Sequence, residues 1–133
     1  MIRPHQQGST PTRSHRWRSI SILATALALG GATIALGHTK VASTSPASGT
    51  TAKTSIKQVT VTFTGPLRRG TLRVVGPGGK VVSAGGGRDP RNVKRLLAGL
   101  QGSLKPGSYK ASWTIVVPDG HRQKGSFRFK LKR

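Results

Sequence analysis

Apolar and polar side chains alternate with a period of two along several short stretches of this chain, and that alternation limits which folds it can adopt. In residues 59–64 valine and phenylalanine alternate with threonine, and in residues 109–117 every second residue is apolar. Residues 127–131 repeat the pattern near the C-terminus. Such alternation is typical of β-strands that bury one face and expose the other.

Glycine and proline mark the turns between these stretches. Residues 76–79 (GPGG) separate a short predicted strand at residues 72–75 from residues 81–82, which predicts a hairpin. Residues 84–92 are mostly glycine and polar residues, which predicts a loop with too little apolar content to pack. Residues 93–100 fit either a short strand or a short helix, because their apolar positions also match a helical stripe.

The N-terminal segment has the features of a signal for export. Four arginines between residues 3 and 18 precede an uncharged apolar run at residues 20–36. Small residues, Ala35 and Gly37, close the run at the positions that a signal peptidase recognises, so we expect a signal peptide at residues 1–37. The protein would then be exported to the periplasm, the outside of the cell or the cell envelope. The alternative is an uncleaved membrane anchor, because the run and its basic leader are long for a signal peptide.

Cleavage would leave residues 38–133 as one domain, a length that suits a small sandwich. About seven short strands with turns between them predict an all-β, Greek-key β-sandwich. Tyr109 and Trp113 lie on the apolar side of their strand, so we expect both in the core rather than in a base-stacking surface. The chain has no cysteine, so a bound metal would need nitrogen and oxygen ligands.

Two histidines would remain after cleavage, His38 and His121. As the first residue, His38 could offer both its α-amine and its imidazole to one metal ion. Asp119, Gly120 and His121 follow the clearest predicted strand, where a tight turn can direct Asp119 and His121 to a common point. Three nitrogens and a carboxylate oxygen in a tetragonal set suit one Cu(II) ion, whereas Zn(II) prefers a tetrahedron. The alternative is that His121 is an ordinary turn residue and that His38 follows the leader by chance.

Four segments resemble the CopC family of copper-binding proteins and occur in the order that the family has. They are residues 38–49 (HTKVASTSPASG), 59–67 (VTVTFTGPL), 104–113 (LKPGSYKASW) and 119–129 (DGHRQKGSFRF). The resemblance implies a cupredoxin-like or immunoglobulin-like sandwich that binds one Cu(II) ion outside the cytoplasm through His38, Asp119 and His121. It also implies a copper carrier or buffer in copper homeostasis or resistance, with a membrane copper transporter as its partner.

The chain departs from the family pattern at three places. Gly65 stands where the family has a glutamate, and the loss of such an outer-shell carboxylate lowers metal affinity by roughly 10- to 100-fold. Residues 117–118 (VP) replace a Ser-Ala pair, and Arg122 replaces a proline and brings a cation close to the expected site. The single methionine is Met1, so we expect no methionine-rich Cu(I) site.

Lysine and arginine number 23 against two acidic residues, Asp89 and Asp119, which gives a formal charge of +21. One interpretation is a basic surface without a function of its own. The other is adhesion to an anionic cell-envelope surface, which would make the chain a cationic binding module without physiological copper. We expect no specific nucleic-acid binding, because no recognition motif is present and export leads away from nucleic acid.

A copper mono-oxygenase is a further alternative, since such enzymes also hold copper through an N-terminal histidine. Against it, residues 38–133 leave no large flat substrate face, and no aromatic pair lies outside the predicted core strands. A hydrolase is harder still to build, because the chain has no glutamate and Asp89 is expected to lie alone in a flexible loop. We therefore expect a binding protein rather than an enzyme, and a monomer.

Overall fold

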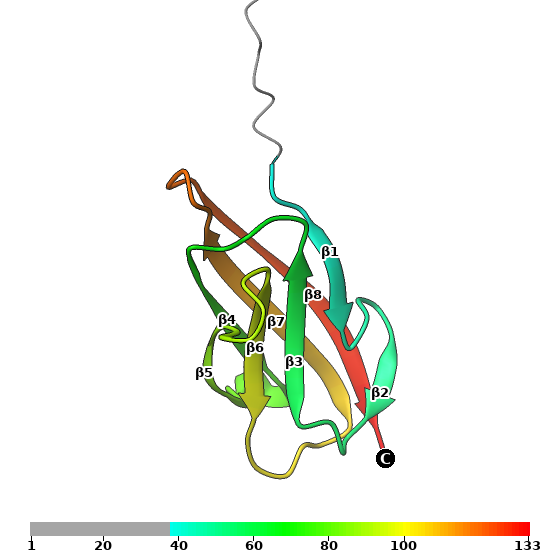
Figure 1. Ribbon diagram of the computed structural model, residues 1–133. Helices are drawn as coiled ribbons and strands as arrows, with labels where there is room; N and C mark the ends of the chain where they lie inside the picture. Colours follow the sequence, from blue (N-terminus) through cyan, green and yellow to red (C-terminus); the bar gives the residue numbers. More distant parts are fainter. Residues whose placement is uncertain (1–37) are drawn as a thin grey trace, which may run out of the picture. The chain divides into compact units, whose positions relative to one another are not determined.

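The computed structural model describes residues 38–133, and Figure 1 shows that they form strands joined by short turns. The predicted signal peptide at residues 1–37 lies outside the described residues. A 3-10 turn, η1 (Pro77–Gly79), is the only helical segment in the described part. These residues include no helix with the length and apolar character needed to cross a lipid bilayer. The strands are β1 (Val41–Ser45), β2 (Thr51–Lys53), β3 (Gln58–Phe63), β4 (Arg69–Val75), β5 (Ser83–Arg88), β6 (Arg95–Leu100), β7 (Gly107–Val116) and β8 (Arg122–Lys132).

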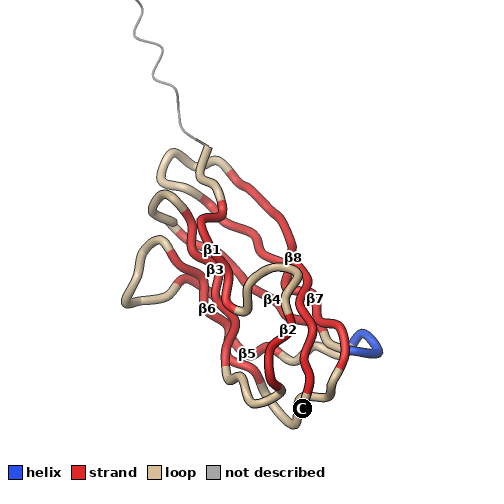
Figure 2. Tube along the Cα trace, turned by 90° about the vertical axis from the view of Figure 1, so that its right-hand side faces the viewer, coloured by secondary structure: helices blue, strands red, loops and turns tan. Residues whose placement is uncertain are grey.

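The strands form one hydrogen-bonded sheet in the order β1-β3-β6-β5-β4-β7-β8-β2. The sheet curls so that β3 and β6 lie opposite β7 and β8, with the core between the two layers (Figures 1 and 2). β4, β5 and β6 follow one another in sequence, and β7 returns to pair with β4, which is a Greek-key connection. The predicted hairpin is present, since β4 and β5 pair across η1. The all-β Greek-key sandwich is therefore confirmed, with eight strands instead of about seven.

The core contains the apolar residues that alternate along the strands. In β3, Val59, Val61 and Phe63 are buried, while Thr60 and Thr62 point away from the core. The same alternation recurs in β7 and β8. Burying one large apolar side chain contributes about 1.5–3 kcal/mol. The buried core residues of the described segment belong to one compact unit of the chain.

Tyr109 and Trp113, both predicted in the core, differ in burial. Tyr109 is 1% exposed, and its hydroxyl donates a hydrogen bond of 2.6 Å to the carbonyl oxygen of Lys105. Trp113 packs edge-on against Phe63, with ring centroids 5.0 Å apart, but it is only partly buried. The cross-strand partner of Trp113 is Gly125, which has no side chain to cover the indole. The core prediction is therefore confirmed for Tyr109 and only half right for Trp113.

The loop predicted at residues 84–92 is wrong in its first half, because β5 occupies residues 83–88 and pairs with both β4 and β6. A Cβ added at Gly86 would collide with the carbonyl oxygen of Leu72 on β4. Glycine thus lets β5 approach β4 closely, and backbone hydrogen bonds take the place of side-chain packing. In the segment that fitted either helix or strand, the strand is found, as β6.

The expectation that Asp89 lies alone in a flexible loop is also wrong. Asp89 is 4% exposed and closes the turn between β5 and β6. Its carboxylate accepts hydrogen bonds from the N–H of Arg91 at 2.9 Å and from Nε of Arg95 at 2.8 Å, and it forms an ion pair with the Arg95 guanidinium at 2.6 Å. The Arg91 N–H, and then Arg95, hold the pKa of Asp89 below its usual value.

We predict that Gly86→Ala lowers the free energy of unfolding by about 1–3 kcal/mol, because the added methyl group forces β5 away from β4. Gly99→Ala is the matched control, since a Cβ added at Gly99 meets no atom within 4 Å. It should change the free energy by less than about 1 kcal/mol. Urea unfolding followed by circular dichroism measures both variants. Equal destabilisation would contradict the close approach of β5 to β4 at Gly86.

A second prediction concerns the pH dependence of stability. Because the pKa of Asp89 is lowered in the folded chain, its stabilising effect is present above the unfolded pKa of about 3.9 and is lost as pH falls through the folded pKa. Asp89→Asn should therefore unfold at a lower urea concentration at neutral pH and lose less stability than the parent between about pH 5 and pH 2. Asp119→Asn removes the same charge at an exposed turn and should shift the midpoint less. An equal loss of stability in Asp89→Asn and in the parent as the pH falls would contradict this role.

Candidate metal centre

The turn between β7 and β8 carries two of the three candidate ligands. The N–H of Val117 donates to the carbonyl oxygen of His121 at 3.0 Å, and the N–H of Gly120 donates to that of Val117 at 2.9 Å. Gly120 has a φ of 93°, a conformation that favours glycine. The tight turn expected from the sequence is therefore present, and Asp119 and His121 stand exposed on it.

Asp119 and His121 contact each other directly. Oδ1 of Asp119 accepts a hydrogen bond from the His121 N–H at 2.9 Å, and Oδ2 lies 2.8 Å from Nδ1 of His121. The His121 side chain is 72% exposed and that of Asp119 is 37% exposed. The N–H of His121, and then its imidazole, hold the pKa of Asp119 below its usual value, and His38 adds a smaller effect in the same direction. Asp119 is therefore ionised at neutral pH.

His38 reaches the same end of the sandwich from the start of the described chain. The N–H of Lys40 donates to Oγ1 of Thr64 at 3.0 Å, and the N–H of Thr64 donates to the carbonyl oxygen of Lys40 at 2.9 Å. These bonds fix the chain two residues after His38 to the end of β3. In Figure 1 the start of β1 (cyan) and the turn between β7 and β8 (orange) lie at the same end of the molecule.

A hollow of about 340 Å³ lies between these two segments. Its lining includes all three candidate ligands, although His38 is far in sequence from Asp119 and His121. Arg122 also lines the hollow, so the cation that replaces the family proline is close to the candidate ligands. Sequence reasoning did not single out Gln123, which lines the hollow as well. Its position two residues after His121 was the available signal, because alternate residues of a strand share a face.

The candidate ligands line the hollow without forming a closed ligand set. Within residues 38–133, no three histidine, aspartate or glutamate side chains come together in an arrangement that could hold a metal ion. Nδ1 of His121 and Oδ2 of Asp119 contact each other at 2.8 Å instead. Both side chains are at the surface, so they can turn without disturbing the core. The donors are imidazole nitrogens and carboxylate oxygens, which suit Cu(II) or Zn(II) better than Cu(I).

Gly65 lies directly against the N-terminal segment. A Cβ added at Gly65 would come within 3.0 Å of Oγ1 of Thr39, the residue that follows His38. A side chain at position 65 would therefore point toward the surroundings of His38. Glycine leaves that place without the carboxylate that the family pattern has there.

Fold and hollow together define a small Greek-key β-sandwich with imidazole and carboxylate side chains gathered at one end. The chain belongs to the CopC domain family, whose sequence model matches residues 41–132. The suspected resemblance to CopC proteins is thereby confirmed. The matched range includes Asp119 and His121, whereas His38 precedes it.

Curated relatives match part of the chain. Protein YobA of Escherichia coli strain K12 and of Shigella flexneri is 42% identical over 45 residues, which is 34% of this chain. The match spans only 36% of each YobA protein, about a third of its length.

Solved structures share the fold. CopC from Methylosinus trichosporium OB3b has a TM-score of 0.60 and 22% identity, and the match covers 71% of this chain and 94% of that one. PcoC, a methionine-rich copper resistance protein from Escherichia coli, has a TM-score of 0.60 and 20% identity, with 71% and 99% covered. At these identities the likeness shows the fold alone.

Proposed function

We propose that the chain is an extracytoplasmic Cu(II)-binding protein, a carrier or buffer in copper homeostasis or resistance. The observation that carries this proposal is that His38, Asp119 and His121 border one hollow, although they come from distant parts of the sequence. Membership of the CopC domain family supports copper as the metal, since PcoC is described as a copper resistance protein. We propose one ion per chain.

Each of the three residues has a distinct part in the proposed site. Removal of residues 1–37 would free the α-amine of His38, so that this amine and the His38 imidazole chelate one ion. His121 would add a third nitrogen, and Asp119, ionised at neutral pH, would add an oxygen and offset positive charge. This donor set suits the tetragonal preference of Cu(II), which also heads the affinity order of the divalent first-row metals. Binding needs the exposed Asp119 and His121 side chains to exchange their mutual contact for the metal.

We place the protein in the periplasm, outside the cell or at the cell envelope, on the strength of the arginines and the apolar run that precede His38. A protein that binds copper outside the cytoplasm needs a membrane protein to move the ion, so we propose a membrane copper transporter as its partner. The proposed role is binding and transfer of the ion by a monomer, without a chemical reaction on a substrate.

Our prediction for copper binding uses residues 38–133 with a free and with a blocked N-terminus. The segment that begins at His38 should bind one equivalent of Cu(II) with a nitrogen-rich tetragonal electron paramagnetic resonance spectrum. The same segment with its N-terminus acetylated keeps every side chain but loses the α-amine as a ligand. Its affinity should be lower by at least about tenfold, because a ligand is lost. Equal affinities would exclude the N-terminal chelate.

The same titration carries two internal checks. His121→Ala in the segment that begins at His38 should also weaken binding. If His121→Ala leaves the Cu(II) affinity unchanged while the change at the N-terminus lowers it, the site is confined to His38. Affinity should fall as pH drops below about 8, because the amine must lose its proton and its reference pKa is about 7.7–8.0.

A further prediction follows from the place of Gly65. Gly65→Glu should raise the Cu(II) affinity of the segment that begins at His38 by roughly tenfold, because a carboxylate near His38 can accept a hydrogen bond from the ligating groups. Gly65→Gln is the matched control, with the same size and no charge. Calorimetric titration measures all three proteins. An equal rise with glutamine, or no rise with glutamate, would contradict the part assigned to position 65.

A further inference from the structure

The outward face of β4, β7 and β8 collects positive charge from three neighbouring strands. Cross-strand pairs place Lys110 beside Arg128, Thr114 beside Lys124, and Arg73 beside Ser112. These residues alternate with the buried core residues of the same strands, so all of them point away from the core. We call this surface the basic face, and its cations include Arg69, Arg73, Lys110, Lys124, Arg128 and Lys130.

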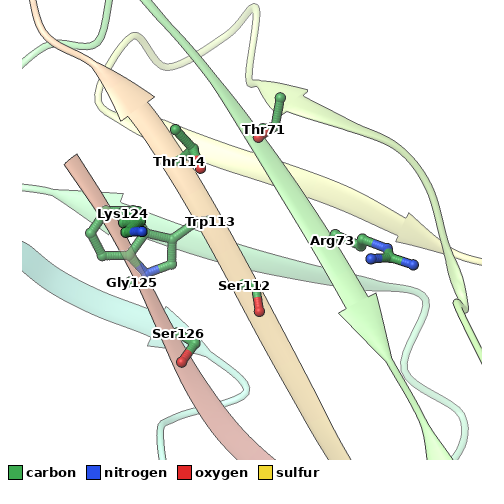
Figure 3. Close-up of a pocket in the computed structure, with 8 residues that line it drawn as sticks. All are labelled: Thr71, Arg73, Ser112, Trp113, Thr114, Lys124, Gly125 and Ser126. Carbon is green, nitrogen blue, oxygen red and sulfur yellow. The ribbon is translucent and has the colours of Figure 1, made fainter. Parts of the chain in front are cut away.

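A hollow of about 550 Å³ lies in the middle of the basic face. Figure 3 shows Arg73 on β4 and Lys124 on β8, with Ser112 and Thr114 on the strand between them. The lining includes hydroxyls and two cations, both of which donate hydrogen bonds to phosphate oxygens, and also the partly buried indole of Trp113. This hollow shares no lining residue with the one at His38.

Among the outward-facing strand residues, the cations gather on β4, β7 and β8 rather than on the opposite layer. The outer surface of β1, β3 and β6 presents rows such as Ser43, Thr62 and Arg95, or Ser45, Thr60 and Leu97. Arg95 is the only cation in these two rows, and Asp89 neutralises it. Neither acidic residue of the chain lies on the basic face, since Asp89 and Asp119 occupy turns.

The fold itself does not favour this arrangement. Lys110 and Arg128 are direct cross-strand neighbours, and like charges in that position are destabilising. The large apolar residues that are exposed in the described part, Val41, Val81 and Val93, lie outside the basic face. A partner of the basic face is therefore recognised mainly through charge and hydrogen bonds, and Trp113 is the one large apolar side chain that lines the hollow.

We propose that the basic face docks on the surface of an anionic phospholipid bilayer, with lipid phosphates entering the central hollow. The cations extend about 10 Å across the strands from β4 to β8 and about 20 Å along β8 from Lys124 to Lys130. This spread in two dimensions matches a plane of headgroups better than one linear polyanion. Because the apolar part of the hollow is limited to the partly buried Trp113, the protein binds at the headgroup level and salt weakens the contact.

The test uses the metal-free segment of residues 38–133, whose core residues belong to one compact unit, and sedimentation with lipid vesicles. The face variant carries Arg73→Gln, Lys110→Gln, Lys124→Gln and Arg128→Gln. The matched control removes four charges from turns and loops through Lys57→Gln, Lys80→Gln, Lys94→Gln and Lys105→Gln. A smaller variant, Arg73→Gln with Lys124→Gln, changes only the two cations of the hollow. Its vesicle binding tests the proposal if the fourfold variant fails to fold.

The parent segment should bind vesicles that contain phosphatidylglycerol and not vesicles of phosphatidylcholine alone. The face variant should bind at least about tenfold more weakly than the parent, and the control less than about threefold more weakly. Equal losses in the face variant and the control would overturn the proposal in favour of net charge. Binding to soluble polyphosphate without binding to the anionic vesicles would overturn it in favour of a linear polyanion. Because no copper is present, neither result depends on the proposed metal site.

Discussion

The antiparallel pairing of β7 with β8 is the contact on which the rest of the molecule depends. It runs without a break from Gly107 and Leu131 to Val116 and Arg122. Because side chains alternate across a strand, this one register sends Tyr109 and Phe129 into the core and Lys110 and Arg128 to the surface. A slip by one residue would exchange the two sets, so the apolar side of the hairpin fixes the position of every charge on its other side.

The same hairpin connects the core to the candidate metal centre. Its closing turn holds Asp119 and His121 at one end of the sandwich, where the backbone bonds of Val117 and Gly120 keep the turn tight. The opposite layer brings His38 to that end, because β1 pairs with β3 and the bonds between Lys40 and Thr64 continue this pairing toward the N-terminus. The hollow therefore lies where the two layers meet, and it depends on both.

The strands that could be predicted from the sequence are those whose side chains alternate between apolar and polar. The strand that was missed is held by backbone pairing and has no such alternation. β3, β7 and β8 were evident because one side of each is apolar. β5 contains three consecutive glycines and no such pattern. Its place between β4 and β6, its neighbours in the chain, results from backbone pairing that leaves no side-chain pattern in the sequence. The role of Asp89 was missed for a similar reason, since its partner Arg95 lies across a turn that follows β5. The candidate ligands could be named from their chemistry, but the mutual contact of Asp119 and His121 depends on side-chain rotation that residue type does not determine.

The division of the sandwich into inward and outward positions also explains how one small domain can carry two separate surfaces. Outward residues of β4, β7 and β8 touch no core residue from the other layer, so lysine and arginine can accumulate there without altering the packing that holds the fold. In the turn between β7 and β8, Val117 packs in the core, whereas Asp119 and His121 are exposed and can change without altering that packing. The two hollows share no lining residue, so a change in the charge of the face leaves the donors at the end of the sandwich in place. Repulsion among the cations weakens the sheet without disturbing its register, because the register is set by the buried side chains.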